Sequence, residues 1–158
     1  YDYTKLLLET GQVALARQTF EPVATKVALD ARLAAAGHWL AACERAPHAR
    51  TMPDLDAAIA ANRRDFDARF ERAQVLLAAS RFTDAMDELL EIVMRDKGWN
   101  DELARKTYVG ILELMSRPAA KPTAEAAKGT LEVTGRARSS AADPLVDQYR
   151  RKLSMALF

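Results

Sequence analysis

The sequence predicts an all-α protein: a right-handed helical solenoid of antiparallel helix pairs, with a further helix that caps its C-terminal end. Composition, a repeated spacing and the helical periodicity of the apolar residues each predict this class. Of 158 residues, 31 are Ala and 19 are Leu, against 8 Val and 3 Ile. Ala and Leu favour helices, whereas β-branched residues favour strands. We therefore do not expect a β-sandwich, a β-barrel or a doubly wound parallel sheet.

The charge balance and the single cysteine narrow the classes of partner and compartment. The formal net charge is +1, with 15 basic and 18 acidic residues over positions 1–115, and 8 and 4 over positions 116–158. A near-neutral chain favours neither nucleic acid nor a membrane surface as a partner. Cys43 is the only cysteine, so no internal disulfide can form, and we expect a reducing compartment. No apolar run reaches the roughly 18–20 residues of a membrane span.

Two segments share one spacing of apolar and small residues at a constant offset of 69 positions. This offset is close to twice the roughly 34-residue period of tetratricopeptide (TPR) repeats. In each segment two leucines close a first helix, a small residue occupies a tight turn, and a small Ala lies where the second helix crosses its neighbour. The sequence thus predicts a TPR-like solenoid. The matched residues are Leu7, Leu8, Gly11, Val13, Ala16, Phe20 and Val23 in the first segment, and Leu76, Leu77, Ser80, Phe82, Ala85, Leu89 and Ile92 in the second.

Apolar periodicity and helix-end signals place the helices of this solenoid. Pro47 ends a long third helix, and Thr51 with Asp54 three positions later caps the fourth. The apolar faces of these two helices are expected to comprise Leu29, Leu33, Ala36, Leu40 and Cys43, and then Leu55, Ala58 and Ile59. The predicted helices, in three antiparallel pairs, are 4–10 with 12–20, 27–45 with 53–62, and 66–79 with 82–96.

A seventh and a last helix complete a single predicted domain of residues 1–158. Asn100 is expected to cap the seventh helix, and Asp143 the last, with Pro144 in its first turn. Between them, residues 117–142 contain several Pro, Gly and Ser residues and are predicted to be a surface insertion, with a weak strand-like alternation at 130–134. The expected apolar faces are Ala104, Tyr108, Ile111, Leu112 and Met115 on the seventh helix, and Leu145, Tyr149, Leu153 and either Ala156 or Leu157 on the last.

Nothing in the sequence forms a catalytic, metal-binding or cofactor-binding constellation, so we expect neither enzyme activity nor a cofactor. His38 lies five residues before Cys43, outside the i, i+4 spacing that would place the two on one helix face. Cys43 itself lies on an apolar stripe and is typical of a small core residue. A solvated helix face explains the acidic residues better than a paired-carboxylate site does, because Glu91 with Arg95 is a favourable i, i+4 pair. These acidic residues are Asp84, Asp87, Glu88 and Glu91.

Protein binding remains as the expected role. Stacked helix pairs leave a concave groove lined by the first helix of each pair. In the clearest repeat the groove side is predicted to carry Asp67, Phe70, Gln74 and Ala78, although Phe70 could equally pack within the array. The last helix is a second candidate, and its end either caps the solenoid or docks into a partner groove. Its candidate partner-binding residues are Tyr149, Arg150, Arg151, Leu153, Leu157 and Phe158.

Three motifs carry a family resemblance. They are the stretch 68–96, the Trp99-Asn100-Asp101-Glu102 element with the residues up to Lys106, and the closing segment 143–158 with its Tyr149-Arg150-Arg151 element. Together they resemble the TPR region of the YbbN/CnoX-like thioredoxin–TPR co-chaperones (chaperedoxins). Residues 1–54 fit the resemblance more loosely. Arg72 stands where a TPR usually has Leu, so the first helix of that repeat is expected to be partly open.

The resemblance implies a bacterial cytoplasmic co-chaperone in which a thioredoxin-like domain precedes these repeats. Such proteins hold unfolding or oxidised clients and deliver them to the GroEL chaperonin, with the C-terminal helix implicated in docking. Any redox function would then belong to the upstream domain rather than to this chain. A general TPR scaffold that binds a peptide or a subunit in its concave groove, without chaperonin, is the alternative. A homo-oligomer stays open as well, because exposed groove surface could pair two copies.

Overall fold

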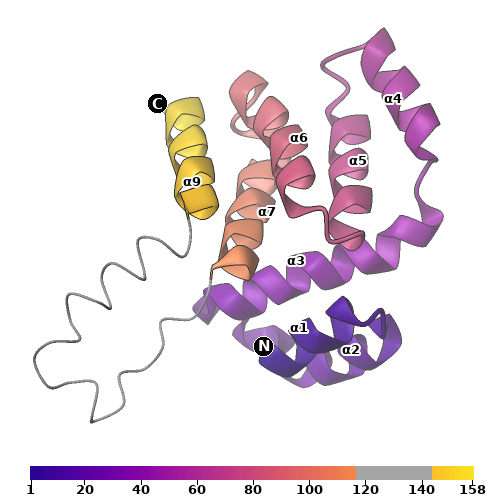
Figure 1. Ribbon diagram of the computed structural model, residues 1–158, viewed down its shortest axis with the longest axis vertical. Helices are drawn as coiled ribbons and strands as arrows, with labels where there is room; N and C mark the ends of the chain where they lie inside the picture. The colour runs from indigo at the N-terminus through magenta and orange to yellow at the C-terminus, as the bar shows by residue number, and fades with distance from the viewer. Residues whose placement is uncertain (117–143) are drawn as a thin grey trace, which may run out of the picture.

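The computed structural model describes residues 1–116 and 144–158, and all regular structure in these two ranges is helical (Figure 1). This confirms the predicted all-α, TPR-like helical solenoid. The predicted insertion at 117–142, the alternation at 130–134 and the Asp143 cap lie outside the described residues. The α-helices are α1 (Asp2–Glu9), α2 (Val13–Phe20), α3 (Ala31–Arg45), α4 (Met52–Ala61), α5 (Phe66–Ala78), α6 (Phe82–Arg95), α7 (Trp99–Met115) and α9 (Pro144–Leu157), and the 3-10 helices are η1 (Glu21–Leu29) and η2 (Ala46–His48).

The turns within the two repeated segments are built alike. Gly11 has φ +77° and Ser80 has φ +62°, so both residues adopt the left-handed conformation that ends a helix. In the first turn the amides of Gly11 and Gln12 donate to the carbonyls of Leu8 and Leu7 at 3.2 and 2.8 Å, respectively. In the second, the amides of Ser80 and Arg81 donate to those of Leu77 and Leu76, both at 2.9 Å. The small residues at the crossings, Ala16 and Ala85, are both fully buried.

The long helix α3 is the centre of the molecule. It lies between α1 and α2 on one side and α5 and α7 on the other, and it contacts all four (Figure 1). Because it is covered on two sides, residues outside the single predicted stripe are buried too, including Trp39. Leu33, Ala36 and Leu40 are buried as predicted, and Cys43 is partly buried.

The predicted start of this third helix is wrong. Residues 27–29 belong to η1, and Asp30 has an extended backbone with φ −138°, where its carboxylate accepts hydrogen bonds from the amides of Arg32 and Leu33. An N-cap residue of this kind begins a new helix. Leu29, expected in the buried stripe, is therefore outside the helix and 90% exposed.

Helix α4 does not pair with α3 as expected. It packs against α5, while α3 packs mainly on α7 and α5. Thr51 caps α4 as predicted, because its hydroxyl accepts a hydrogen bond from the Asp54 amide at 3.3 Å. Of its predicted inward residues, Leu55 is fully buried, and Ala58 and Ile59 are partly buried.

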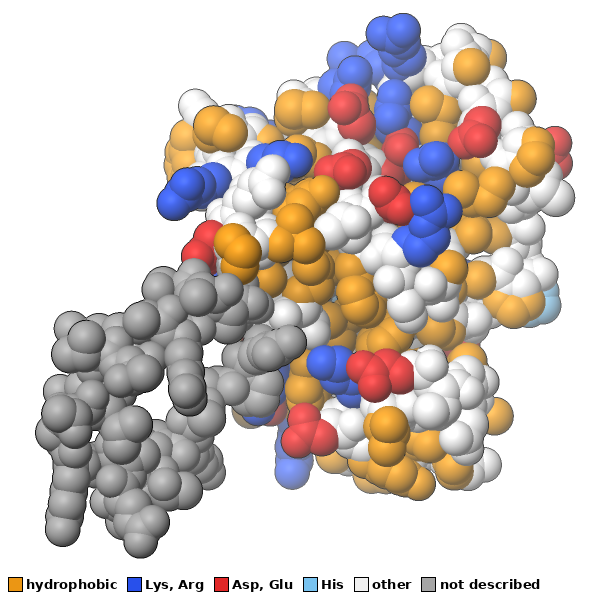
Figure 2. Space-filling view, viewed as in Figure 1, with side chains coloured by type: hydrophobic (Ala, Val, Ile, Leu, Met, Phe, Trp, Pro, Cys, Tyr) orange, Lys and Arg blue, Asp and Glu red, His pale blue; other side chains and the backbone are white. Residues whose placement is uncertain are grey.

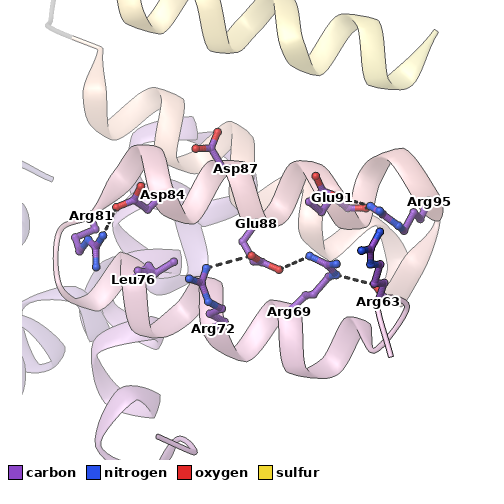
Figure 3. Close-up of a pocket in the computed structure, with 10 residues that line it drawn as sticks. All are labelled: Arg63, Arg69, Arg72, Leu76, Arg81, Asp84, Asp87, Glu88, Glu91 and Arg95. Carbon is purple, nitrogen blue, oxygen red and sulfur yellow. Dashed lines mark hydrogen bonds and ion pairs between the residues drawn. The ribbon is translucent and has the colours of Figure 1, made fainter. Parts of the chain in front are cut away.

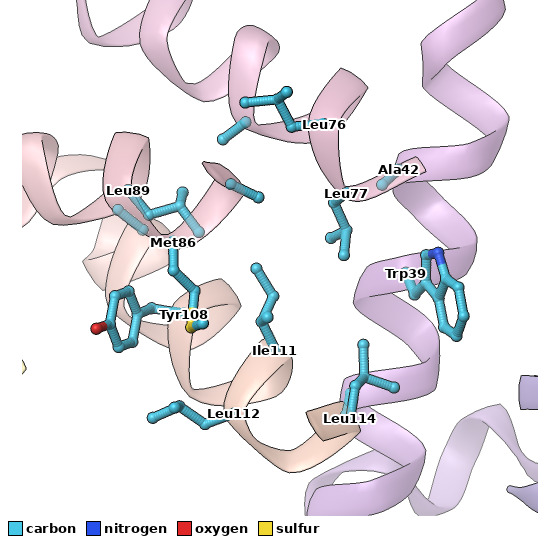
Figure 4. Packing of buried hydrophobic residues seen from close by; sticks show 14 of the residues in the cluster. Trp39, Ala42, Leu76, Leu77, Met86, Leu89, Tyr108, Ile111, Leu112 and Leu114 are labelled. Carbon is cyan, nitrogen blue, oxygen red and sulfur yellow. The ribbon is translucent and has the colours of Figure 1, made fainter. Parts of the chain in front are cut away.

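The core lies where α3, α5, α6 and α7 meet (Figure 4). Trp39 of α3 packs edge-on against Phe82 of α6, with ring centroids 5.3 Å apart. Leu77 and Ile111 are fully buried between these helices, and burial of each such side chain contributes about 1.5–3 kcal/mol. The predicted apolar face of the seventh helix is confirmed, since its residues are buried except for the partly buried Met115.

The start of α7 differs from the expected capped helix. Asn100, Asp101 and Glu102 all have left-handed backbone angles, with φ between 47° and 61°, and no side-chain hydrogen bond caps the helix. The prediction of Asn100 as the N-cap is therefore wrong. Left-handed backbone costs a non-glycine residue about 1–2 kcal/mol, so surrounding contacts must hold this turn in place.

Helix α9 covers one end of the solenoid by packing against α6 and α7. Val146, Tyr149 and Leu153 are buried in this contact. The Tyr108 hydroxyl donates a hydrogen bond to the Tyr149 carbonyl at 2.7 Å, and the Tyr149 hydroxyl donates one to Asp87 at 2.9 Å. The helix thus closes the solenoid as a cap. Among the described helices, none combines the length and apolar character needed to cross a membrane.

Candidate functional site

A groove with a cavity of about 470 Å³ lies between the end of α3, helix α5 and the start of α7. We call it the α3–α5–α7 groove. Its size falls within the roughly 300–1,000 Å³ range of ligand pockets. The lining residues are Glu44, Arg45, His48, Ala49, Asp67, Phe70, Glu71, Gln74, Trp99, Asn100 and Leu103.

Aromatic side chains form the apolar part of this groove. The rings of Phe70 and Trp99 lie 5.4 Å apart at 50°, and Trp99 also meets Phe66 at 6.3 Å and 65°. Phe70 is mostly buried, whereas Trp99 and Leu103 are only partly covered. Aromatic rings supply large contact area with few rotatable bonds, so this arrangement provides a rigid apolar surface.

Gln74 is a polar residue of the lining whose Oε1 is buried without a hydrogen-bond donor among the described residues. Its side chain is 5% exposed, and its Oε1 accepts no hydrogen bond within the part of the chain that the structure describes. A buried carbonyl left without a donor costs about 1–3 kcal/mol. Oε1 is itself shielded from solvent, so a bound donor could reach it only after the side chain moved.

Ion pairs neutralise two of the three acidic residues in the lining. Glu71 accepts hydrogen bonds from the Arg50 backbone amide, Nε and Nη2 at 2.7–2.9 Å, and Glu44 accepts one from the Arg17 Nε at 2.7 Å. Burial alone would raise the pKa of Glu71, but the Arg50 hydrogen bonds outweigh it and lower that pKa. The hydrogen bond from Arg17 likewise lowers the pKa of Glu44. Both carboxylates therefore stay ionised and matched at neutral pH.

A second hollow, of about 540 Å³, lies between α5 and α6 and is lined mainly by charged residues of both signs (Figure 3). Figure 2 shows these charges interleaved on the surface over the two helices. Glu88 lies at its centre, accepting from Arg69 at 2.7 Å and Arg72 at 3.1 Å. The solvated face expected for the acidic residues is wrong for Glu88, which is 9% exposed. The predicted Glu91–Arg95 pair is confirmed.

These contacts also explain Arg72, which replaces the usual Leu of a TPR. Its guanidinium bonds Glu88 on α6 and Asp56 on α4, the latter at 2.8 Å. The aliphatic stem can cover apolar surface while the charged end is paired. The position is partly buried rather than open.

The structure divides the predicted partner-binding residues of the last helix into two groups. Tyr149 and Leu153 are buried against the solenoid, so they hold the helix in place and are not accessible to a partner. Arg150 and Arg151 are exposed, Leu157 is partly buried, and Phe158 is fully exposed. A shallow hollow on the accessible face of α9 is lined by Pro144, Asp147, Gln148, Arg151, Lys152 and Met155.

Burial shifts the pKa values of both residues that were considered as catalytic groups, Cys43 and His38. Burial, with a smaller effect of Glu44, raises the pKa of the Cys43 thiol to about 11. A nucleophilic cysteine needs the opposite shift, because the thiolate is the reactive form. Burial, with a smaller effect of Lys106, lowers the pKa of His38 and so favours its neutral imidazole form.

Three of the four groove residues predicted from the sequence line the same cavity. Asp67, Phe70 and Gln74 face it, whereas Ala78 lies outside its lining. The sequence reasoning missed the opposite wall, formed by Glu44 to Ala49 and by Trp99 to Leu103. The Trp99-Asn100 element was a recognisable motif, but only the packing of α7 on α3 and α6 brings Trp99 against Phe66 and Phe70 of α5.

A helical solenoid with an open groove defines a class of protein-binding repeat proteins. A family model described as Tetratricopeptide repeat matches residues 45–134, more than half of the chain. This chain belongs to the tetratricopeptide repeat family, and its repeats form a protein-interaction module. Neither the curated proteins nor the solved structures include a match to the chain.

Proposed function

We propose that this chain is the interaction module of a thioredoxin-like co-chaperone. Unfolded client segments occupy the α3–α5–α7 groove, and the exposed face of α9 contacts a GroEL-type chaperonin. The observation that carries the proposal is the groove itself, a cavity of about 470 Å³ with a rigid aromatic wall. Unfolded chains expose large apolar side chains, which such a wall can take up.

Two further features support the chaperonin contact. The resemblance of the closing segment to the chaperedoxins points to α9 as the docking element. On that helix, Met155 is 75% exposed and Phe158 is fully exposed. Exposed apolar side chains next to basic ones suit an interface with an apolar centre and a polar rim.

Capture of purified chaperonin on immobilised chain tests this contact. Met155→Ser and Phe158→Ser change exposed side chains, so the fold should persist while capture falls by about tenfold or more. Leu29→Ser is the matched control, because Leu29 is 90% exposed and lies on η1. Failure of the unchanged protein to capture chaperonin at low salt would overturn the docking proposal. Equal capture by the Met155→Ser, Phe158→Ser and Leu29→Ser proteins would also overturn it.

A general peptide-binding scaffold is the second candidate function. The observation that favours it is that the groove is built from α3, α5 and α7, with no residue of α9 in its lining. Peptide binding that survives the α9 variants and occurs without any chaperonin capture would favour this role over the first.

We also propose that the chain has no catalytic role of its own. The raised pKa of Cys43, about 11, keeps its thiol protonated at neutral pH and supports this view. A turnover that Cys43→Ser or His38→Gln abolishes, with folding intact by circular dichroism, would overturn it.

A further inference from the structure

We propose that copies of this chain associate head to tail, with the outward side of α9 in one copy seated on the exposed side of α1 in the next. This contact involves the two ends of the solenoid rather than the α3–α5–α7 groove, so it goes beyond the proposed function. Helices α1 and α9 lie at different ends of the molecule (Figure 1), and a contact between them therefore joins two copies.

The first repeated segment lacks the helix that covers the second. Helix α4 packs against α5, where Asp56 accepts a hydrogen bond from Arg72 at 2.8 Å. At the constant offset of 69 positions, Arg72 corresponds to Tyr3 and Val75 to Leu6. Among the described elements α1 packs on α2 and α3, and Tyr3 and Leu6 stay 56% and 53% exposed. A helix that packed on α1 as α4 packs on α5 would cover both side chains.

The exposed side of α1 is apolar at its centre and acidic beside it. Asp2 and Glu9 lie four residues before and three residues after Leu6, which places them on the same helix face. Both are exposed and form no ion pair within residues 1–116 and 144–158. Lys5, the one Lys or Arg of α1, instead donates a hydrogen bond to a carbonyl of α7 at 3.2 Å. We call Asp2, Tyr3, Leu6 and Glu9 the α1 face, and it suits an apolar partner helix with a basic rim.

The outward side of α9 has the complementary pattern. Met155 points away from the side that packs on α6 and α7 and is 75% exposed, and Phe158 is fully exposed. Arg151 lies one helical turn before Met155, is exposed, and has no ion pair in the part of the chain that the structure describes. We call these three residues the α9 face. It offers apolar side chains and a cation to the apolar and acidic α1 face.

The α1 and α9 faces are different surfaces, so a contact between them does not use up both faces of either copy. A heterologous contact of this kind builds open chains of copies unless the rotation between them closes a ring. Self-association should therefore continue beyond the dimer as the protein concentration rises. The end units of a solenoid need a polar outer side to stay soluble, and stacking would cover the apolar α1 face.

Sedimentation velocity from about 5 to 500 μM protein tests this contact over the dissociation constants expected of a small interface. The weight-average sedimentation coefficient of the unchanged protein should keep rising over this range. Tyr3→Ser with Leu6→Ser (the α1 variant) should weaken association about tenfold or more, and Met155→Ser with Phe158→Ser (the α9 variant) should do the same. Leu29→Ser is the matched control, because Leu29 is 90% exposed and belongs to neither face.

Mixing the two double variants isolates the head-to-tail contact. The α1 variant keeps an intact α9 face, and the α9 variant keeps an intact α1 face. Each variant alone should stay monomeric, whereas the mixture should form a one-to-one dimer and nothing larger. Glu9→Lys places a cation opposite Arg151 and should weaken self-association of the otherwise unchanged protein about two- to fivefold.

Three results would overturn the head-to-tail contact: no association of the unchanged protein at about 500 μM, a plateau at the dimer, or a mixture of the two variants that stays monomeric. Chaperonin capture separates this contact from the proposed function. The α1 variant should lose self-association and still capture chaperonin, because its α9 face is unchanged. Absence of capture by the unchanged protein, together with a dimer in the mixture, would remove the co-chaperone role and support the head-to-tail contact.

Discussion

The two repeated segments, α1–α2 and α5–α6, have the same turn between their helices but differ in the length of the second helix. Both have a left-handed residue and the same pair of backbone hydrogen bonds. Helix α2 nevertheless has 8 residues, and α6 has 14. Pro22 of the first segment occupies the position of Glu91 in the second, and proline interrupts the α-helical hydrogen-bond ladder. The turn conformation is thus repeated, but the residue at one position, Pro22 or Glu91, determines how far the second helix continues.

The second segment also contains a buried ion network that the first one lacks. Arg69 and Arg72 on α5 meet Glu88 on α6. The position of Glu88 corresponds to Thr19 in the first segment, whose hydroxyl only bonds the Leu15 carbonyl of its own helix. The same turn is therefore compatible with a pair of helices that a buried ion network links and with a pair that has no such network at this position.

Removing the central carboxylate should have the largest effect on this comparison. Glu88→Ala leaves Arg69 buried without its acidic partner, and breaking a buried pair in this way costs about 3–5 kcal/mol. Thr19→Ala, at the corresponding position, should change the free energy of unfolding by about 0.5 kcal/mol or less. Urea unfolding followed by circular dichroism measures both values.

A double variant sharpens this prediction. Arg69→Met with Glu88→Leu replaces the buried pair by apolar side chains, and such exchanges are often neutral or stabilising. We expect it to recover most of the stability lost in Glu88→Ala. A Glu88→Ala protein within about 1 kcal/mol of the unchanged protein would show that the network contributes little.

Substitutions at the two helix crossings should differ less in their effect on stability than Glu88→Ala and Thr19→Ala do. Ala16 and Ala85 are both fully buried, and inserting a larger side chain into such a contact costs about 1–3 kcal/mol. Ala85→Leu should be the more damaging, because α6 is packed against α5, α7 and α9, whereas the first segment lies at one end of the solenoid and can relax. Thermal unfolding compares them, with the exposed Ala14→Leu as control. A larger loss for Ala16→Leu would contradict this ranking.

Helix α9 adds a pH dependence through its contact with the second segment. Burial, the hydrogen bond to Asp87 and the nearby acidic charges raise the pKa of Tyr149 from 10.0 to about 12. A group with a raised folded-state pKa stabilises the protein fully below its unfolded pKa, and that contribution disappears as pH rises. Stability should therefore fall between about pH 10 and 12.

Tyr149→Phe should flatten that decline and cost about 1 kcal/mol at pH 7 through the lost hydrogen bond. Part of the alkaline decline should remain, because burial also raises the pKa of Tyr108. Tyr3→Phe changes an exposed ring of the first segment and should match the unchanged protein. Urea unfolding at several pH values gives the profile, and an unchanged profile for Tyr149→Phe would count against the Asp87 contact.

Local signals allowed the turns and most helix faces to be predicted, because they depend on residues close in sequence. The small residues at 11 and 80 and the Thr51 cap are examples. The burial of Trp39 and Glu88 could not be predicted, because it depends on which helices cover the second side of α3 and of α6. The same holds for the groove: its α5 face could be predicted from the sequence, whereas its opposite wall depends on how α3 and α7 pack around α5.

The smallest expected effect tests the shared turn itself. Left-handed backbone costs a residue with a Cβ about 1–2 kcal/mol, partly offset by the roughly 0.5–1 kcal/mol of extra chain entropy that glycine loses on folding. Ser80→Gly should therefore stabilise the protein by about 0.5–1 kcal/mol, and Gly11→Ser should destabilise it by a similar amount. A Cβ at Gly11 would meet no atom within 4 Å, so the change reports backbone conformation without a clash. Equal and opposite shifts in the urea midpoint would establish that the two turns are energetically equivalent, whereas shifts of the same sign would show that the repeat holds in geometry alone.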